Sequence, residues 1–257
     1  MYFIGQTHIM NQLSDILPTL YGNKSGASFC IRGPSGWGKT RLALMMCNYL
    51  SGGSFSVYLG DKVNFDKSHR VHFIDEVHLM KTPEMLYPLM DSKEYVIIIA
   101  TNDAAILPEA LVNRCFEFIF EQYTKEELSE ICRMNLKFPM QNSFVDYVVE
   151  SSGGNPRVMK NLLDRLNMIM LNRPNLINSL DIGGFKGLLK DVFGIVNGMD
   201  VLCIRYMDAL QNVGGTASIQ TISTMLHVDQ GTLKFYVEPV LLYKNKIRIT
   251  SRGRSLI

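Results

Sequence analysis

A glycine-rich run that ends in lysine and threonine, GPSGWGKT at Gly33 to Thr40, has the residue types that bind phosphate. In a run of the form G-x-x-x-x-G-K-[ST], backbone N–H groups surround the β- and γ-phosphates, the lysine bridges phosphates and the hydroxyl binds Mg²⁺. The residues that we expect to hold ATP here are Gly33, Pro34, Ser35, Gly36, Gly38, Lys39, Thr40 and Arg41. The run alone is compatible with a motor, a small-molecule kinase or a passive nucleotide switch.

Two adjacent carboxylates, Asp75 and Glu76, follow the apolar run VHFI and predict a site for a metal ion and a water molecule. In P-loop folds such carboxylates lie at the edge of the sheet where metal and water are held. We expect Asp75 to be a magnesium ligand together with Thr40, and Glu76 to polarise the attacking water. A carboxylate beside the metal suits activation of water, so the pair favours hydrolysis over the chemistry of a small-molecule kinase.

Two further polar residues complete the expected catalytic set. Asn102 lies near the end of the apolar run YVIIIATND, at 95–103, where it would hydrogen-bond the γ-phosphate or the water. Arg114 precedes the apolar run CFEFIF, on the side where a neighbouring subunit would approach. An arginine supplied by another subunit raises the rate of hydrolysis by about 10³ to 10⁵. The expected catalytic residues are Lys39, Glu76, Asn102 and Arg114.

These side chains need strands and helices that place them together, and the sequence predicts such elements. The run FCIR at 29–32 predicts a strand that leads into the glycine-rich loop, and TRLALMMCNYLSGG predicts a helix that glycines close. The apolar runs that end at Asp75, near Asn102 and at Phe120 predict further buried strands. Strand, loop and helix in this order are the context that a phosphate-binding loop requires.

A helix is predicted to follow the run SSGG, with Asn155 as its N-cap and Pro156 at its first position. Arg157 then falls in the first turn, where the helix dipole disfavours a cation. An arginine at that place suggests an anionic ligand, so we expect Arg157 to contact the nucleotide. The apolar residues that recur at every fourth position are Val158, Leu162, Leu166 and Met170.

The composition is that of a globular protein with a sizeable core: 257 residues, 47% apolar and 19% charged. No apolar run approaches the length that crosses a bilayer, and the N-terminus resembles no export signal. The five cysteines are scattered and form no C-x-x-C pair, which predicts reduced thiols and a cytoplasmic protein.

Cations concentrate at the C-terminus although the net charge is only +2. From residue 244 onward there is no acidic residue, which predicts attraction to a nucleic-acid backbone, with a solvated basic tail as the alternative. The expected DNA-binding residues are Lys244, Lys246, Arg248, Arg252 and Arg254.

The motifs, in this order and spacing, resemble those of an AAA+ ATPase: Walker A, Walker B, sensor 1, arginine finger and sensor 2. Within that superfamily the chain resembles the bacterial RuvB family of Holliday-junction motors. The stretches that carry the resemblance are FIGQ at 3–6, FIDEVH at 73–78, LYPLM at 86–90, GGNPRVMKNLLDR at 153–165 and VEPVLLYKNKIRITSRGR at 237–254.

The resemblance implies a fold, further residue roles and an assembly. A parallel-sheet α/β ATPase domain at 1–120, an α-helical lid at 121–183 and a winged-helix DNA-binding domain at 184–257 are expected. Phe3 and Ile4 would line the adenine pocket, and Arg157 would couple the lid to the γ-phosphate. Arg114 would reach the site of a neighbour in a hexameric ring, and the C-terminal cations would contact DNA largely without regard to sequence.

The chain departs from the family at one place. Members of the RuvB family carry a long β-hairpin that docks the partner RuvA, whereas here only DSKE, at 91–94, joins the LYPLM run to the next strand. Four residues are too few for two strands and a turn. Docking of a RuvA-type adaptor by that route is therefore not expected.

Three functions remain open at this point. The first is an ATP-driven DNA motor that acts on branched or duplex DNA. The second is an AAA+ loader or DNA-bound switch that places a helicase, clamp or recombinase on DNA. The third, a DNA-binding scaffold whose ATP site serves assembly only, is disfavoured because Glu76 and Arg114 supply both hydrolytic groups.

Overall fold

The computed structural model describes residues 2–102 and 107–257, so Asp103, the end of the strand run expected at 95–103, lies outside the described residues. The chain divides into two units, Met1–Gln122 and Tyr123–Ile257. Within the described residues, no helix has the length and apolar character needed to span a membrane.

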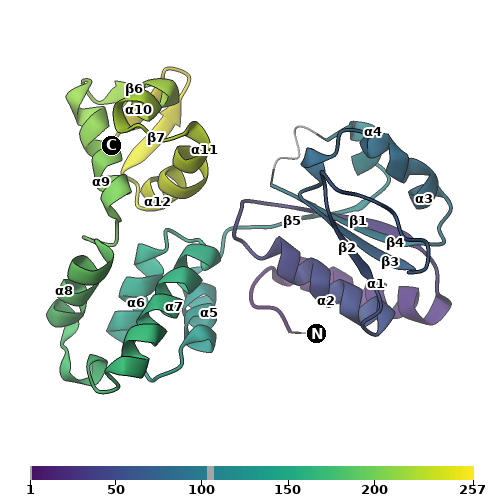
Figure 1. Cartoon of the computed structure of the whole chain (residues 1–257), viewed down its shortest axis with the longest axis horizontal. Coiled ribbons are helices and arrows are strands. Elements are labelled where there is room, and N and C mark those ends of the chain that lie inside the picture. Colours follow the sequence, from purple (N-terminus) through teal and green to yellow (C-terminus); the bar gives the residue numbers. More distant parts are fainter. Residues whose placement is uncertain (1, 103–106) are drawn as a thin grey trace. The chain divides into compact units, whose positions relative to one another are not determined.

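The first unit is built on a parallel sheet (Figure 1). Its strands are β1 (Ala27–Arg32), β2 (Ser56–Leu59), β3 (Val71–Asp75), β4 (Val96–Thr101) and β5 (Phe116–Ile119). They lie in the order β2-β3-β4-β1-β5, and each strand is parallel to its neighbours in the sheet. The strands expected from the apolar runs are thereby confirmed.

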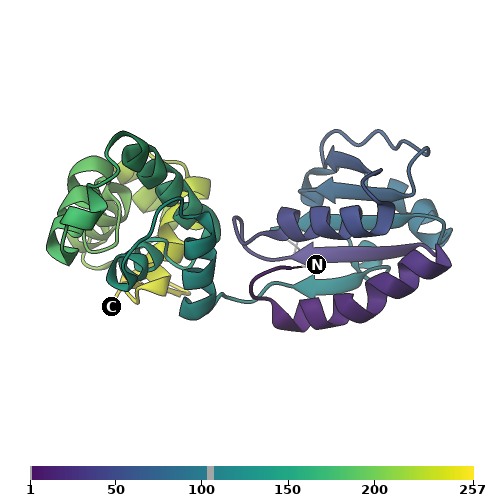
Figure 2. The ribbon, with the colours of Figure 1, turned by 90° about the horizontal axis from the view of Figure 1, so that it is seen from below.

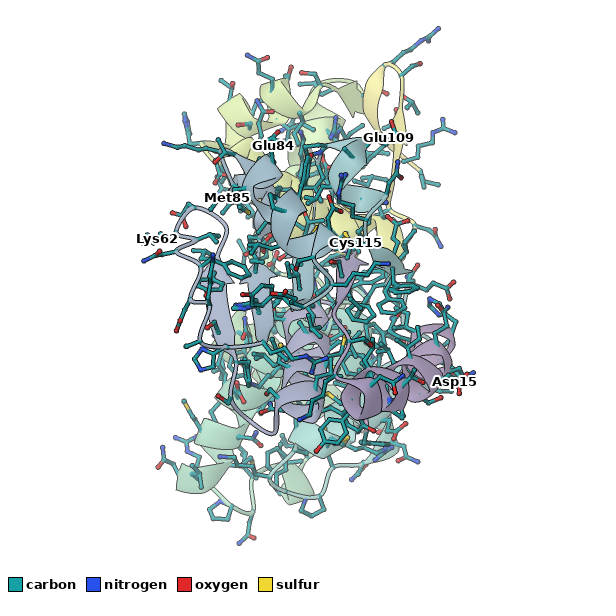
Figure 3. The ribbon with its side chains drawn as sticks, turned by 90° about the vertical axis from the view of Figure 1, so that its right-hand side faces the viewer. Asp15, Lys62, Glu84, Met85, Glu109 and Cys115 are labelled. Atoms are coloured by element: carbon teal, nitrogen blue, oxygen red, sulfur yellow. The ribbon has the colours of Figure 1, made fainter. Side chains whose placement is uncertain are left out.

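Helical segments cover both faces of this sheet, as Figures 1 and 2 show. Their bounds are α1 (Thr7–Asn23), α2 (Lys39–Ser51), η1 (Val77–Leu79), η2 (Pro83–Leu86), α3 (Tyr87–Asp91) and α4 (Glu109–Val112). α1 and α2 pack on the face that buries Phe29 and Phe73. Residues of η1, η2, α3 and α4 pack on the other face, against Ile97 and Ile99. Figure 3 looks at the first unit with Glu84 and Met85 of η2 and Glu109 of α4 labelled, all three exposed.

The register of the sheet brings the expected site residues to one end. Arg32, the last residue of β1, pairs with Thr101, the last residue of β4. Ile74 of β3 pairs with Ile99 of the same β4. Because the strands are parallel, the loops that follow β1, β3 and β4 all leave the sheet at the same end, the one formed by the carboxyl ends of the strands.

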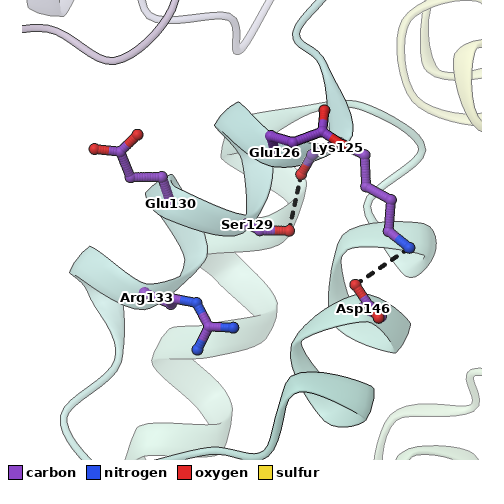
Figure 4. Close-up of a pocket in the computed structure, with 6 residues that line it drawn as sticks. All are labelled: Lys125, Glu126, Ser129, Glu130, Arg133 and Asp146. Atoms are coloured by element: carbon purple, nitrogen blue, oxygen red, sulfur yellow. Dashed lines mark hydrogen bonds and ion pairs between the residues drawn. The ribbon is translucent and has the colours of Figure 1, made fainter.

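The second unit begins with helices that we call the lid helices: α5 (Lys125–Asn135), α6 (Asn142–Ser151), α7 (Pro156–Asn172), η4 (Ile177–Ser179) and α8 (Ile182–Phe193). Thr124 and Glu127 form a capping box at the start of α5. Lys125 Nζ lies 3.2 Å from Asp146 Oδ1 and so joins α5 to α6. The polar pocket beside this ion pair (Figure 4) is lined by Lys125, Glu126, Ser129, Glu130, Arg133 and Asp146.

α8 corrects the sequence analysis at one point. The boundary expected between residues 183 and 184 falls inside this helix, and its glycine-rich start forms no loose join. The Asp181 side chain caps the helix by accepting from Gly184 N–H, and Phe185 stacks on Phe144 of α6 at a centroid distance of 4.3 Å. Apolar packing outweighs the low helix propensity of the glycines. We propose that the lid extends to Phe193.

The remainder of the second unit is a small α/β fold. Its elements are α9 (Val201–Asn212), β6 (Thr216–Ala217), α10 (Ile219–Leu226), α11 (Gln230–Thr232), η5 (Leu233–Val237), α12 (Glu238–Tyr243), β7 (Ile247–Thr250) and β8 (Gly253–Leu256). β7 and β8 form an antiparallel hairpin, and β6 pairs with β8. We call this remainder, residues 194–257, the winged-helix part, after the domain expected there, and the β7–β8 hairpin its wing.

Candidate active site and DNA-binding surface

The phosphate-binding loop connects β1 to α2, and its glycines are needed for its shape. A Cβ atom at Gly33 would lie 2.7 Å from Cβ of Phe120, closer than real Cβ atoms approach. Gly38 has φ of 99°, a conformation that side-chain-bearing residues rarely adopt. α2 begins at Lys39, so the N–H groups of its first turn face the loop and add positive potential there.

Lys39 points back into the loop. Its Nζ donates to the carbonyl oxygens of Gly33 at 2.8 Å and Pro34 at 3.0 Å. The residue is only 5% exposed, so the ammonium group is held inside the loop rather than in solvent. This is the place at which an ammonium group would meet phosphate oxygens bound by the loop.

Thr40 and Asp75, expected as magnesium ligands, are in direct contact although they are far apart in the chain. The Thr40 hydroxyl donates to Asp75 Oδ2 at 2.7 Å, and the backbone N–H of Glu76 donates to Asp75 Oδ1 at 3.0 Å. Hydroxyl and carboxylate oxygens are the hard ligands that Mg²⁺ takes, usually with phosphate and water oxygens as the others. The residues present therefore fit a magnesium ion bound beside the loop.

Glu76 occupies a strained place directly after β3. Its φ is 49°, in the left-handed region, which is uncommon for a residue other than glycine. Its Oε2 atom is buried without a hydrogen-bond partner. The His78 ring lies beside it, with Nδ1 3.4 Å from Oε2 but without the geometry of a hydrogen bond. His78 received no role in the sequence analysis, where it appeared only as the last residue of FIDEVH.

Asn102 follows the last residue of β4 and is half-buried. The preceding Thr101 accepts a backbone hydrogen bond from Gly33 N–H at 3.4 Å, which ties the end of β4 to the start of the phosphate-binding loop. Asn102 therefore lies at the end of the sheet where Lys39, Thr40 and Asp75 also meet. Its contact with phosphate or water stays a prediction.

Arg114 lies at the opposite end of the sheet, where the strands begin. Ile119, at the end of β5, pairs with Arg32 of β1, whereas Arg114 precedes the start of β5, so the length of that strand, roughly 10 Å, separates the two ends. The guanidinium donates to both carboxylate oxygens of Asp91, at 3.0 and 3.3 Å, and lies 4.5 Å from the centre of the Tyr87 ring. The hydrogen bonds to Asp91 raise the pKa of Arg114. Arg114 is thus held far from the phosphate-binding loop of its own chain.

The N-terminal residues expected at the adenine pocket pack beside the end of β5. Phe3 meets Phe120 edge to face at 6.0 Å, and the Arg41 guanidinium lies 6.0 Å from the Phe3 ring centre. The Gln6 side chain exchanges two hydrogen bonds with the backbone of Glu121. Ile4 is half-buried. An adenine-binding role for Phe3 and Ile4 stays a prediction.

Arg157 lies in the second unit, at the start of α7. The Asn155 side chain accepts from Arg157 N–H at 3.0 Å and Pro156 opens the helix, which confirms the predicted cap. Arg157 is exposed. The buried side of α7 is made by Met159, Leu162, Leu163, Leu166 and Met170, while Val158 is only half-buried. Contact between Arg157 and a nucleotide stays a prediction.

The five C-terminal cations do not share one environment. Arg254 is 16% exposed and forms an ion pair with Glu238, at 2.8 Å from Nε to Oε1, and the Glu238 side chain is itself 4% exposed. Lys244 packs against Gly198, and burial lowers its pKa. Lys246, Arg248 and Arg252 are exposed on or beside the wing. Arg254 and Lys244 therefore pack within the second unit, whereas the other three are exposed, and contact of the five with DNA stays a prediction.

The sequence comparisons find two families in the chain. Residues 29–123 match the ATPase family associated with various cellular activities (AAA), and residues 196–257 match the RuvB C-terminal winged helix domain. The first match covers the strands that carry the site residues, and the second covers nearly all of the winged-helix part.

Relatives and solved structures match almost the whole chain. The RuvB subunit of the Holliday junction branch migration complex from Mycoplasma genitalium is 24% identical and aligns with 98% of this chain and 92% of its own length. The corresponding subunit from Campylobacter hominis is 27% identical, with 86% and 75% covered. The structure of the Thermotoga maritima RuvB branch migration motor superposes with a TM-score of 0.83 at 23% identity, covering 99% and 93%. This last likeness shows the fold.

The fold and the family matches together define a chain with an AAA ATPase domain, lid helices and a winged helix. The expected fold class is thereby confirmed. The chain resembles RuvB proteins, as the motifs predicted: its C-terminal residues match the RuvB winged helix domain, and RuvB subunits align with nearly its full length.

Proposed function

We propose that this protein is an ATP-hydrolysing, ring-forming motor of the RuvB type that moves branched or duplex DNA. The observation that carries the proposal is the convergence of the phosphate-binding loop, the Thr40–Asp75 hydrogen bond and Glu76 at one end of the sheet, in a chain that also has a RuvB-type winged helix. The relatives that it matches are named subunits of the Holliday junction branch migration complex.

The chemistry at this end of the sheet would be hydrolysis of ATP. Backbone N–H groups of the loop and the Lys39 ammonium would hold phosphate oxygens, and Thr40 and Asp75 would hold Mg²⁺, which when bound would offset phosphate charge. Glu76 accepts a proton from the water that attacks the γ-phosphate, and Asn102 orients the transferred group. Arg157 of the lid helices would contact the same phosphate.

The position of Arg114 supports assembly. An arginine at the opposite end of the sheet cannot serve the phosphates held by its own chain, whereas a head-to-tail neighbour would present its phosphate-binding loop to it. Head-to-tail contacts close into a ring when the rotation between subunits permits. A hexamer is the ring size that the resemblance to the RuvB family implies.

Contact with DNA is assigned to the exposed cations of the wing. Lys246, Arg248 and Arg252 are exposed, and cations of this kind bind phosphates largely without regard to sequence.

We also propose a cytoplasmic protein. This is supported by five free cysteines, four of them buried, with burial raising the pKa of Cys30 and of Cys47 to about 12.

A second candidate function, a DNA-bound loader, is favoured by one observation. α3 ends at Asp91 and β4 begins at Val96, so the chain crosses from helix to strand with no projecting hairpin between them. An adaptor of the RuvA type would need another docking surface. A protein without that adaptor either moves DNA alone or places a different partner on it.

A strand-displacement assay separates these functions. Purified protein, ATP and Mg²⁺ are incubated with a labelled four-way junction and with a plain duplex of the same sequence, without other proteins. A motor separates the arms of the junction in an ATP-dependent way, and Glu76→Gln, as the matched control, binds the junction without moving it. ATP-dependent binding without strand separation by the unaltered protein would contradict the motor and support the loader.

A further inference from the structure

His78 lies between two parts of the proposed active site. It belongs to η1, just after the strand that carries Asp75, and its side chain is 15% exposed. Its Nδ1 is 3.0 Å from the Thr101 hydroxyl and 3.4 Å from Glu76 Oε2. One ring nitrogen therefore faces both the end of β4 and the carboxylate that is expected to act on water.

A ring nitrogen carries at most one proton, and this limits what His78 can do at one time. With a proton on Nδ1, the imidazole donates either to the Thr101 hydroxyl or to the Glu76 carboxylate. In the present arrangement the Thr101 contact has hydrogen-bond geometry, and Glu76 Oε2 is left buried without a partner. A buried carboxylate oxygen in that position is costly, so a small rotation of either side chain toward a hydrogen bond is favourable.

Thr101 connects this histidine to the rest of the site. Its carbonyl oxygen accepts from Gly33 N–H of the phosphate-binding loop, and the next residue along the chain is Asn102. Movement at the end of β4 when phosphate binds would therefore change the partner offered to His78 Nδ1.

We propose that His78 is a positioning residue that orients the Glu76 carboxylate through Nδ1 and, through Thr101, makes that orientation depend on the end of β4. The inference rests on the proposed ATPase function. It assigns to His78 no contact with ATP, metal or the attacking water.

The test compares His78→Ala, His78→Asn and the unaltered protein by steady-state ATPase kinetics. His78→Ala is expected to lower kcat at least about tenfold while the affinity for a non-hydrolysable ATP analogue changes less than about twofold, because only the orientation of Glu76 is lost. His78→Asn keeps an amide donor near the same place and is expected to recover a substantial part of kcat. His69→Ala, a histidine of the same unit that contacts Ser56 and Asp66, serves as the matched control and should leave kcat unchanged.

A double-mutant cycle distinguishes positioning from a general structural role. If His78 acts through Glu76, adding His78→Ala to Glu76→Gln should lower the residual rate no further. Unchanged kcat in His78→Ala, weakened analogue binding in both His78 variants, or additive losses in the cycle would overturn the inference. Equal ATPase rates in Glu76→Gln and the unaltered protein would instead overturn the proposed function.

Discussion

Glu76 combines a left-handed backbone with a buried, unpartnered carboxylate oxygen. Neither feature stabilises the fold, and strained residues of this kind persist where function selects them. Thr40 and Asp75, by contrast, already form a hydrogen bond with each other. The proposed site thus divides into a hydrogen-bonded pair that would fit a metal ion and a carboxylate whose Oε2 atom has no hydrogen-bond partner.

Glu76→Gln keeps the size of the side chain but removes its ability to accept a proton. The variant is expected to bind ATP and to assemble as the unaltered protein does, while kcat falls by about a hundredfold or more. Equilibrium binding of a fluorescent ATP analogue and release of phosphate measure the two effects separately. Unaltered phosphate release would remove Glu76 from the reaction.

At this scale the sequence predicts residues whose roles depend on local spacing. The loop from Gly33 to Thr40 and the carboxylates after β3 are recognisable because the strand-loop-helix order is local. The contacts of His78 with Thr101 and of Arg254 with Glu238 are not local in this sense. They depend on how elements pack, so the sequence analysis gave His78 no role and assigned Arg254 to DNA.

The winged-helix part contains a buried polar cluster that joins the wing to the helices through hydrogen bonds and an ion pair. Glu238 of α12 accepts from Arg254 of β8 and from the Tyr206 hydroxyl of α9, at 2.8 and 2.7 Å. Three elements that are distant in sequence therefore meet on one carboxylate. A charge removed from such a cluster leaves its partner buried and unpaired.

Arg254→Ala is accordingly expected to destabilise the winged-helix part by about 3 kcal/mol, because Glu238 loses its ion pair while remaining buried. Hydrogen exchange of the full chain, followed in peptides from α9 and β8, measures the effect. Arg252→Ala is the matched variant: it should leave exchange unchanged, weaken DNA binding across sequences and lower the salt slope by about one. Equal exchange in both variants would show that the Arg254 pair contributes nothing to stability.

At the scale of elements, the strands were more predictable than the boundaries between parts. Buried strands appear as short apolar runs in the sequence, whereas α8 begins with glycines that indicate a loop. Its helix forms because Asp181 caps it and Phe185 packs on Phe144. Such tertiary contacts override local propensity, and a single sequence does not reveal them.

At the scale of the whole molecule, we propose that the active site would be shared between copies of the chain. Arg114→Ala and Lys39→Ala should each lose most ATPase activity, the first by about 10³-fold or more. Mixing the two variants should restore part of the activity, because a subunit with intact Lys39 can then receive Arg114 from its neighbour. Phosphate release across a series of mixing ratios measures the rescue. Lys39→Ala mixed with Glu76→Gln is the control, because neither variant then has a complete pocket and no rescue is expected. Absence of rescue at every ratio would count against sharing of the site.

The fold of the whole chain and its likeness to RuvB followed from motifs spread along the sequence. Subunit contacts did not, because a surface arginine such as Arg114 has no local pattern that distinguishes it from others. Its role is argued instead from the parallel strand order, which puts it at the end of the sheet opposite the phosphate-binding loop.

That separation of Arg114 from the loop has a geometric outcome for any assembly. Each copy carries the phosphate-binding loop at one end of its strands and Arg114 at the other. A linear row of copies therefore always ends in one loop that receives no arginine and one arginine that reaches no loop. Only a closed circle leaves neither. The direction of the strands would thus make any assembly that shares the site head to tail, and the rotation between neighbouring copies would decide whether it closes.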